Sequence, residues 1–537
     1  MRAAGHFFRG VVLLGLTTLH ACGGNSSTPS ALDKQLEVPQ PAPPSVPAVQ
    51  APDPLLPFQW HLINSLGVDL NVEPVWNNGL SGRGVLIAIV DDGIEMTHED
   101  LQPNLSPSAS HVYNGQPGSP STEPSMNHGT AVAGLVAALR QNGKGGSGVA
   151  PAATLANYAL TDNPTDLNIE NAMRRDPAVA ISNNSWSEDP DKTGELYSPS
   201  LLWKQAIDKG VKTGRDGLGT VYVWAAGNGG VPDGDPVVDN SNYDGMANAR
   251  QVLAICAVGD RGKRASYSEH GANLWICAPS WQGEQATRMV TTTDRTATPG
   301  YNAGTSPDDY PDASYTNSFA GTSASAPLAS GSIALMLQAN PLLNWRDIRL
   351  ILAQTAVKND PRDADWTETG GTPKYHVNHK YGFGLLDVGA AVTAAKTWVS
   401  VAAERVTDNK TATPNIAIPD SNLAGVTSTI QIDDDLSIEF IEVTFSALHK
   451  YHGELTVNLI SPTKTKSILA QAHGCFKESA TGIPKAIPCT SKYDSWVFGV
   501  ARHLGETAKG IWTLQVADEL KDDVGTFQSW SVKFYGH

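Results

Sequence analysis

Two patterns of hydrophobic positions divide the chain into a long middle region and a shorter C-terminal region. In the middle region, short unbroken apolar runs predict buried strands at residues 85–90, 179–182 and 221–225. Helical stretches lie between them, at residues 130–140, 200–209 and 325–338. Strands that alternate with helices predict a parallel sheet with right-handed crossovers. Residues 53–398 are therefore expected to form an α/β domain.

From residue 400 the pattern changes to short segments in which hydrophobic and polar residues alternate. Residues 455–460 and 512–516 are two examples. A period of two is typical of strands with one buried face, so residues 400–537 predict an all-β domain. We expect its Trp496, Trp512 and Trp530 to be core aromatics rather than a ligand-binding surface.

The first 52 residues carry neither pattern. Arg2 and Arg9 precede a short apolar run that ends at Cys22, which predicts an export signal over residues 1–22. Its end resembles the lipobox of bacterial lipoproteins, in which Cys22 carries a lipid anchor, and a plain signal peptide stays open. Residues 23–52 are rich in Ser and Pro and predict a disordered, extended tether. We expect a protein of the bacterial cell envelope, an outer-membrane lipoprotein, or one secreted from the cell.

The charge balance limits the classes of partner. The chain has 38 Lys and Arg against 54 Asp and Glu, a net charge of −16. Such a field argues against nucleic acid and anionic lipid, and it suits cationic substrates or bound cations.

The cysteines predict disulfides, because an even number remains in an exported chain once Cys22 is set aside. Cys475 and Cys489 flank a short polar loop and are the expected pair. For Cys256 and Cys277, both in apolar strand-like runs, a bridge and two buried thiols stay open.

Three separate motifs carry the residue types of nucleophilic catalysis. Asp91 ends an apolar strand, His128 opens a helix of small residues, and Ser323 opens another in the segment Gly-Thr-Ser-Ala-Ser-Ala-Pro. The order Asp, His, Ser matches one known order of the catalytic triad. Asn228, in a glycine-rich turn after a strand, is the expected side-chain donor to an oxyanion.

Taken together, these four motifs resemble the subtilase superfamily over residues 53–398. Finer features resemble its kexin and furin branch, the proprotein convertases: a second acid, Asp92, follows Asp91, and residues 53–60, 344–347 and 381–387 resemble the ends of that catalytic domain. The C-terminal region is similar to the P domain of that branch, a β-sandwich of jelly-roll type. The resemblance implies a serine endopeptidase that binds Ca²⁺.

The resemblance also implies residues that bind substrate, with a preference for Lys or Arg at P1 and P2. They are Asp92, Ser185, Trp186, Ser187, Asp189 and Asp244. The match at Asp189 needs a one-residue deletion, so Asp191 stays an alternative. The chain departs from the convertase pattern at Ser125, where those enzymes carry an acid, and Asp166 matches the S4 acid only loosely.

Two calcium sites are implied in the same way. The ligands of one are Asp53 and Asp100 with the loop residues Leu139, Asn142, Lys144 and Gly146. The other, beside the S1 pocket, includes Asp239 and Glu269. Oxygen ligands from carboxylates and a Gly-rich loop suit Ca²⁺.

Other functions stay open at this point. They are a broad-specificity subtilisin-like protease, an inactive surface-binding protein, and an acid-acting protease of the sedolisin type. The interval between Cys22 and Asp53 is short for a folding prodomain, so a separate chaperone is one expectation. We expect the chain to be a monomer.

Overall fold

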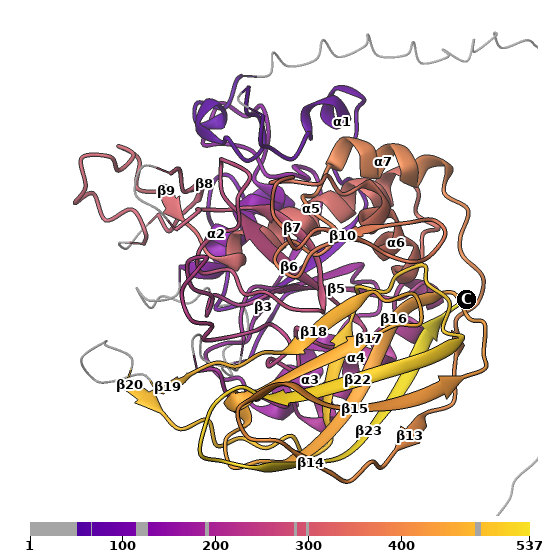
Figure 1. Ribbon diagram of the computed structural model, residues 1–537. Helices are drawn as coiled ribbons and strands as arrows, with labels where there is room; N and C mark the ends of the chain where they lie inside the picture. The colour runs from indigo at the N-terminus through magenta and orange to yellow at the C-terminus, as the bar shows by residue number, and fades with distance from the viewer. Residues whose placement is uncertain are drawn as a thin grey trace, which may run out of the picture. The chain divides into compact units, whose positions relative to one another are not determined.

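The computed structural model describes residues 51–65, 67–113, 127–187, 193–283, 287–296, 300–477 and 485–537 (Figure 1). The expected export signal, the tether as far as residue 50, and the positions Ser125, Asp189 and Asp191 lie outside these residues. Ala51 already pairs with Asn142, so regular contacts begin two residues before the expected domain start at Asp53.

A seven-stranded parallel sheet organises the N-terminal region, in the order β2-β3-β1-β4-β5-β6-β7. Its strands are β1 (Leu86–Asp91), β2 (His111–Val112), β3 (Thr154–Ala159), β4 (Ile181–Asn184), β5 (Val221–Ala225), β6 (Val252–Val258) and β7 (Leu274–Pro279). The three expected strands are β1, β4 and β5, each buried along nearly all of its length. The predicted α/β fold is confirmed.

Helices cover both faces of this sheet, because alternate side chains of each strand point to opposite sides. Ile87 and Ile89 of β1 belong to one core with α2 (His128–Ala137) and α5 (Thr322–Ala339). Ala88 and Val90 belong to a second core with α3 (Asp166–Arg174) and α4 (Leu201–Thr213). The remaining helices are α1 (Glu73–Asn77), α6 (Trp345–Thr355), α7 (Val388–Thr397) and the 3₁₀ turns η1 (Leu56–Phe58), η2 (Gln102–Asn104) and η3 (Gly214–Gly217).

All three expected helices differ from the sequence prediction at their ends, and α4 runs on to Thr213 rather than residue 209. Helix α2 ends at Ala137 rather than residue 140, because the chain there leaves α-geometry and enters the loop of Leu139 to Gly146. Helix α5 begins at Thr322 rather than residue 325, so Ser323 lies in its first turn. Small strands complete the region: β8 (Val290–Thr293) pairs with β9 (Tyr315–Phe319), and β10 (Thr367–Glu368) pairs with β11 (His376–Val377).

The C-terminal region forms two antiparallel sheets around one core, which confirms the expected all-β domain (Figure 1). One sheet consists of β12 (Arg405–Val406), β13 (Lys410–Ala412), β14 (Ile416–Ile418), β16 (Ile438–Leu448), β21 (Trp496–Val500) and β23 (Gly525–Gly536). The other consists of β15 (Asn422–Ile432), β17 (Leu455–Ile460), β18 (Lys466–Ala470) and β22 (Gly510–Asp518). Trp496, Trp512 and Trp530 are buried in the core, as expected.

Two disulfides join neighbouring strands. Cys475–Cys489 is the pair expected from the sequence, and it closes the hairpin of β19 (Cys475–Lys477) and β20 (Lys485–Ile487). Cys256 and Cys277 are direct register partners in β6 and β7 and also form a bridge. The alternative of two free thiols at these positions is therefore wrong.

Residues 50–537 form one compact unit that contains both regions. Within the part of the chain that the structure describes, no helix combines the length and hydrophobicity that crossing a membrane requires.

Candidate active site

Asp91 and His128 form a hydrogen-bonded pair at the carboxyl edge of the sheet. Strand β1 ends at Asp91, whose side chain is 3% exposed, and α2 begins at His128, whose side chain is 27% exposed. Nδ1 of His128 lies 2.8 Å from Oδ1 of Asp91. Burial alone lowers the pKa of His128, but the charge and hydrogen bond of Asp91, with the charge of Asp92, raise it above its ordinary value. The geometry leaves Nε2 as the basic nitrogen.

Asp92 holds the start of α2 from outside the helix. Its carboxylate accepts the backbone N–H groups of His128 at 3.0 Å and Gly129 at 2.7 Å. These donors have no partner within the helix, and the positive end of the helix dipole favours a carboxylate there. Burial and the neighbouring Asp91 raise the pKa of Asp92. This half-buried acid therefore fixes the backbone that carries His128.

Ser323 lies in the first turn of α5, on the side of the site where strand β4 ends. Its Oγ donates to the carbonyl of Ser185 at 3.2 Å, and Oγ of Ser185 donates to the carbonyl of Ser323 at 3.1 Å. No hydrogen bond between Ser323 and His128 is formed among the described residues. The two parts meet through Phe319, four residues before Ser323, whose ring centroid lies 5.3 Å from that of His128.

Asn228 follows the carboxyl end of β5, and its amide orientation is fixed. Its Oδ1 accepts the backbone N–H of Thr322 at 2.8 Å and the hydroxyl of Thr322 at 2.9 Å. A Cβ added at Gly321 would lie 3.7 Å from Nδ2 of Asn228 and 3.5 Å from the backbone nitrogen of Ser323. Two N–H donors thus lie on one side of Gly321. The sequence motifs did not single out Thr322, although its place before Ser323 was a usable signal.

Of the residues expected in the S1 pocket, Ser187 and Asp244 are in contact. Ser187, just beyond β4, donates through Oγ to Oδ2 of Asp244 at 2.7 Å. The other carboxylate oxygen of Asp244 accepts the backbone N–H of Met246 at 2.7 Å. Trp186 packs on Trp224 with ring centroids 5.0 Å apart, which anchors this segment to β5.

Asp239 and Glu269, the expected ligands of the second calcium, contact different neighbours. Asp239 accepts the backbone N–H of Gly194 at 3.3 Å. Glu269 accepts the N–H of Gly229 at 2.9 Å and lies against Gly227, where an added Cβ would come within 2.2 Å of Oε1. Gly227 has φ +108°, so this turn beside Asn228 requires glycine for its backbone as well.

The C-terminal domain contacts Thr193 and Gly194, in the segment between Ser187 and Asp239. Nε2 of His473 and Nε2 of His452 lie 2.8 Å and 3.0 Å from the carbonyl of Gly194, and each donates its N–H there. In the disulfide-closed hairpin, the N–H of Phe476 bonds the carbonyl of Thr193 at 3.0 Å. Nothing in the sequence indicated these contacts, because they join residues more than 250 positions apart.

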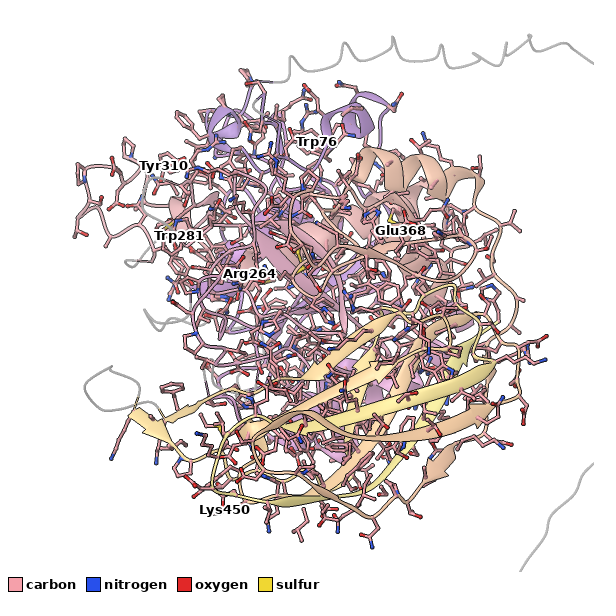
Figure 2. All side chains as sticks on the ribbon, viewed as in Figure 1. Trp76, Arg264, Trp281, Tyr310, Glu368 and Lys450 are labelled. Atoms are coloured by element: carbon pink, nitrogen blue, oxygen red, sulfur yellow. A yellow bond between two sulfur atoms is a disulfide. The ribbon has the colours of Figure 1, made fainter. Side chains whose placement is uncertain are left out.

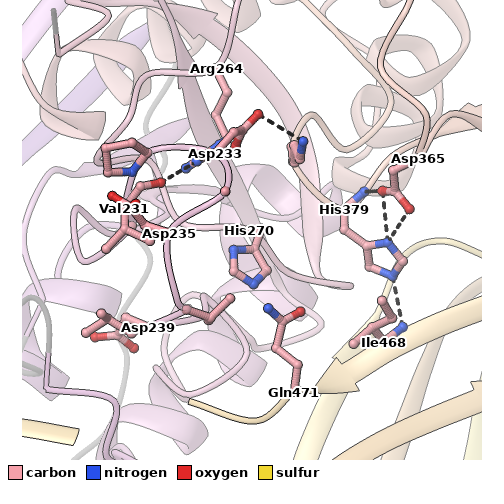
Figure 3. A pocket seen from close by; sticks show the side chains of 16 residues that line it. Val231, Asp233, Asp235, Asp239, Arg264, His270, Asp365, His379, Ile468 and Gln471 are labelled. Carbon is pink, nitrogen blue, oxygen red and sulfur yellow. Dashed lines mark hydrogen bonds and ion pairs between the residues drawn. The ribbon is translucent and has the colours of Figure 1, made fainter. Parts of the chain in front are cut away.

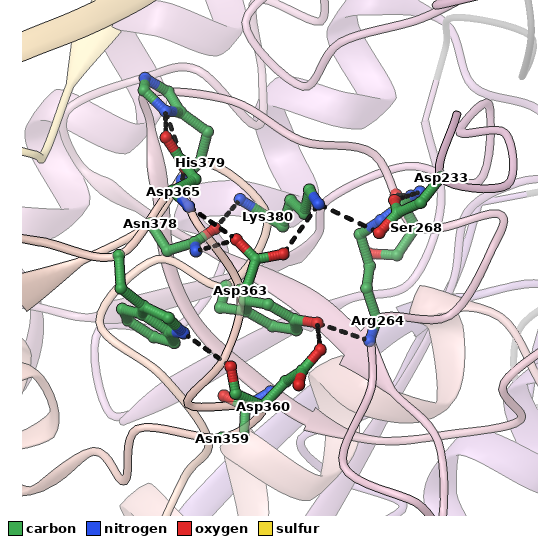
Figure 4. Close-up of polar contacts among 12 residues, drawn as sticks. Asp233, Arg264, Ser268, Asn359, Asp360, Asp363, Asp365, Asn378, His379 and Lys380 are labelled. Atoms are coloured by element: carbon green, nitrogen blue, oxygen red, sulfur yellow. Dashed lines mark hydrogen bonds and ion pairs between the residues drawn. The ribbon is translucent and has the colours of Figure 1, made fainter. Parts of the chain in front are cut away.

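A cavity of about 250 Å³ lies between the two domains near Asp239, and His270 and Gln471 are among the side chains that line it (Figure 3). A network of ion pairs holds its wall (Figure 4). Arg264 donates to the carbonyl of Val231 at 2.6 Å and pairs with Asp233 at 2.8 Å. Lys380 joins Asp233 at 3.0 Å to Asp363 at 2.8 Å. The network braces the chain that follows Asn228.

The expected first calcium site gathers two buried carboxylates around the loop after α2. Asp53 accepts the N–H of Gln141 at 2.7 Å and of Asn142 at 3.0 Å. Asp100 accepts the side-chain amide of Asn142 at 2.7 Å, and its own carbonyl accepts the N–H of Leu139 at 3.0 Å. The backbone N–H of Lys144 bonds Oδ1 of Asn142 at 3.0 Å. Gly146 packs against the amide of Gln59.

The residues of this loop fit a cation. Oδ2 of Asp100 is buried and has no hydrogen-bond partner. Burial, together with the charges of Asp53 and Glu99, raises the pKa of Asp100 to about 7, although Asn142 lowers it. Gly145, at φ +43°, leaves open the space beside this oxygen, because a Cβ there would lie 2.5 Å from it. A buried, unpaired carboxylate is costly, and a hard cation relieves that cost.

Known proteins resemble this chain over most of its length. A family model described as the subtilase family matches residues 82–384, and one described as the proprotein convertase P-domain matches residues 438–534. A PC3-like endoprotease (variant B) of Hydra vulgaris is 34% identical over 88% of this chain and 64% of its own length. Proprotein convertase subtilisin/kexin type 7 of Mus musculus is 34% identical over 90% of this chain and 61% of its own.

The chain thus spans less than two thirds of the length of these two relatives. Among solved structures, the serine protease of Aeromonas sobria in complex with the chaperone ORF2 superposes with a TM-score of 0.79. It is 25% identical, and the match covers 91% of this chain and 95% of that one.

Proposed function

Because the chain belongs to the subtilase family and carries a P domain of the proprotein convertase type, we propose that it is a serine endopeptidase. Asp91, His128 and Ser323 form its triad, and Asn228 is its oxyanion donor. The single observation that carries this proposal is the 2.8 Å bond between His128 Nδ1 and Asp91. That bond fixes the tautomer in which Nε2 accepts a proton.

The reaction follows from the groups at the site. Ser323 Oγ leaves its bond to the Ser185 carbonyl by rotation about χ1 and attacks the peptide carbonyl carbon, while His128 Nε2 takes its proton. Asn228 Nδ2 and the backbone N–H of Ser323 stabilise the oxyanion. His128 then gives the proton to the leaving amine, and a water molecule repeats the sequence to release the acid.

We propose Lys or Arg as the preferred P1 residue. Asp244 is buried, with one oxygen bonded to Ser187 and the other to the backbone of Met246. Buried carboxylates provide the compensation that a desolvated Lys or Arg side chain requires. Asp189 is proposed as a second acid of this pocket, with Asp191 as the alternative. Asp92 faces P2, and Trp186 with Ser185 pairs with the substrate backbone.

We propose that activity depends on Ca²⁺. Asp53, Asp100, Leu139, Asn142, Lys144 and Gly146 would hold one ion, and Asp239 with Glu269 a second. Bound calcium supplies positive charge and rigidity at these places. The residues themselves do the positioning: the loop of Leu139 follows directly from α2, which carries His128, and Glu269 bonds the turn beside Asn228.

A profile of cleaved peptide bonds, with and without a calcium chelator, tests these proposals together. We expect cuts after Lys and Arg, lost after prolonged chelation. Cuts spread over apolar P1 residues would point to the broad-specificity alternative. Asp244→Asn should raise KM for a P1-Lys peptide much more than for a P1-Phe peptide. Lack of any cleavage by the native chain would favour the inactive binding protein, and a rate maximum at strongly acid pH would favour the sedolisin type.

The proposed setting is the bacterial envelope or the medium outside it, with Cys22 as a lipid anchor and the chain as a monomer. Protein and peptide substrates with basic residues are the proposed partners, and nucleic acid is not. The Aeromonas sobria neighbour was solved with a chaperone, and we extend a separate folding chaperone to this chain as a proposal. Refolding of the purified chain alone to full activity would eliminate it.

A further inference from the structure

Three side chains of metal-ligating type meet at one end of the P domain, apart from every motif used above. His449 directly follows β16, Glu454 ends the 3₁₀ turn η4 (His452–Glu454), and Asp518 is the last residue of β22. One ligand atom from each lies within 4.8 Å of the other two. Three separate segments of chain therefore converge on one point.

His449 and Asp518 are buried and Glu454 is half-buried, and no Lys or Arg of the described residues forms an ion pair with the two acids. The exposed fractions of the side chains are 2% for His449, 13% for Glu454 and 0% for Asp518. The nearby Lys450 lies at the surface and pairs with Asp523 at 3.3 Å instead (Figure 2). A buried and a half-buried carboxylate with one imidazole leave uncompensated negative charge, which is costly in the interior.

The orientation of His449 points a nitrogen at these carboxylates. Nδ1 lies 2.8 Å from the carbonyl of Tyr451 and 3.2 Å from its amide nitrogen. Nε2 lies 3.3 Å from Oδ2 of Asp518, and in the tautomer that donates Nδ1–H to the Tyr451 carbonyl the lone pair on Nε2 is free to bind a cation beside that carboxylate. Histidines that bind metals usually donate their other N–H to a carbonyl in this way. Oε2 of Glu454 is also buried and has no hydrogen-bond partner.

We propose that His449 Nε2, Glu454 and Asp518 bind a divalent cation of the class that takes mixed imidazole and carboxylate ligands, and that Zn²⁺ is its representative. Three such ligands with a water molecule complete the tetrahedral set that Zn²⁺ accepts. Ca²⁺ takes six to eight oxygen ligands and would not use the nitrogen. This site is separate from both proposed calcium sites, and it does not depend on the proposed peptidase activity.

The cation would hold the turn η4 in place. Glu454 ends that turn, and His452 begins it and donates to Gly194, in the segment between Ser187 and Asp239. A cation at Glu454 would thus stabilise the contact of the P domain with the wall of the proposed S1 pocket.

A second group in the P domain also combines ligand types: His452, His473, Cys475 and Cys489. Its sulfur atoms are bonded to each other as a disulfide, and both histidines donate Nε2–H to Gly194. Those atoms are already used, so this group carries no metal proposal.

Titration calorimetry with Zn²⁺ tests the proposal, on the full chain carrying Ser323→Ala so that it does not digest itself. We expect one equivalent of Zn²⁺ to bind and to resist dialysis. Asp518→Asn and His449→Gln should weaken that binding by at least about 10- to 100-fold, the loss typical even for outer-shell partners of a metal. The matched control is Glu519→Gln, which removes the adjacent exposed carboxylate that bonds Thr456.

The proposal would be overturned if the site bound Ca²⁺ as tightly as Zn²⁺ and His449→Gln did not change the affinity. Equal Zn²⁺ affinity in every variant would also overturn it. Substitutions at the buried positions can prevent folding, so a second measurement uses Co²⁺ as the probe. Co²⁺ is added to the chain without a substitution at the site and to Glu454→Gln, which keeps the side-chain shape. We expect visible absorption bands of four-coordinate Co²⁺ that Glu454→Gln reduces. The pale spectrum of six-coordinate, all-oxygen Co²⁺ contradicts the assignment.

Discussion

The two domains each bring together a serine, a histidine and an acid. In the peptidase domain these are Ser323, His128 and Asp91. In the P domain, Oγ of Ser467 lies 3.0 Å from Nε2 of His503, and Nδ1 of His503 lies 3.4 Å from Oε2 of Glu506. By hydrogen bonding alone the second group is the more complete, because its serine contacts its histidine and Ser323 does not.

The two groups differ in their exposure to solvent and in the hydrogen-bond donors that surround the acid. Ser467, His503 and Glu506 are completely buried, whereas the side chain of His128 is 27% exposed. Glu506 is also saturated: it accepts the N–H of Gly370 at 2.9 Å and the hydroxyls of two threonines. Burial would raise the pKa of Glu506, but the bond and charge of His503 and these donors lower it to about 2.

The comparison teaches that the composition of a triad does not make an active site. A carbonyl carbon must reach the hydroxyl, and an amide donor must lie where the oxyanion forms. In the peptidase domain, Asn228 and the exposed side of His128 are the groups proposed to meet these needs. In the P domain the same residue types fasten β18 to the peptidase-domain segment of Gly370.

The largest expected effect comes from removing each serine hydroxyl. Ser323→Ala should lower kcat on a peptide substrate by about 10⁴-fold or more, because it removes the nucleophile. Ser467→Ala should leave kcat unchanged and lower the free energy of unfolding by about 1–3 kcal/mol, because it leaves Nε2 of His503 buried without a partner. Single-turnover kinetics and thermal unfolding of both variants test these two expectations. An equal loss of kcat in both variants would contradict the distinction between the two groups.

A smaller effect is expected from the oxyanion donor. Asn228→Ala should lower kcat about 100- to 1,000-fold with little change in KM, because the donor acts on charge that develops only in the transition state. Thr322→Val, which removes the hydroxyl that orients the Asn228 amide, should give a smaller loss of the same kind. Steady-state kinetics measure both, and a rise in KM alone would assign Asn228 to substrate binding.

Calcium removal should affect the peptidase domain first. At a Ca²⁺ concentration of 100 Kd, the linkage stabilises the folded chain by about 2.7 kcal/mol. We expect Asp100→Asn to reduce the gain in melting temperature that Ca²⁺ gives, since only the second proposed site would remain. Glu99→Gln, at the exposed neighbouring acid that pairs with Lys144, should keep the full gain. Calorimetric melting with and without Ca²⁺ measures this gain in melting temperature. Equal gains in both variants would show that Asp100 is not a ligand.

The smallest expected effect is a shift in the pH profile. His128 must be neutral to accept the proton, and its raised pKa means that kcat/KM falls as the pH drops through that value. The charge of Asp92 helps to raise this pKa, so Asp92→Asn should lower it and move the acid limb to lower pH, by about one unit or less. Glu506→Gln should not move the limb. Profiles of kcat/KM against pH test this, and a shift to higher pH would contradict it.

The sequence alone predicted the elements that depend on local pattern. The strand that ends at Asp91 follows from an unbroken apolar run, and helices that start near His128 and Ser323 follow from runs of small residues. The sequence also placed Asn228 in a glycine-rich turn after a strand. Parallel strands expose their carboxyl ends at one edge of the sheet. The match of Cys475 to Cys489 came from short separation along the chain.

Tertiary structure alone decided what depends on distance through space. Register in the sheet, rather than any feature of the sequence, makes Cys256 and Cys277 partners. The sequence could not indicate that Asp92 caps α2 or that P-domain histidines bond Gly194, because each contact depends on how separate elements pack. Local pattern fixes the type and ends of an element through its own backbone and hydrophobic face, whereas contacts between elements are selected only when the whole chain buries its surface.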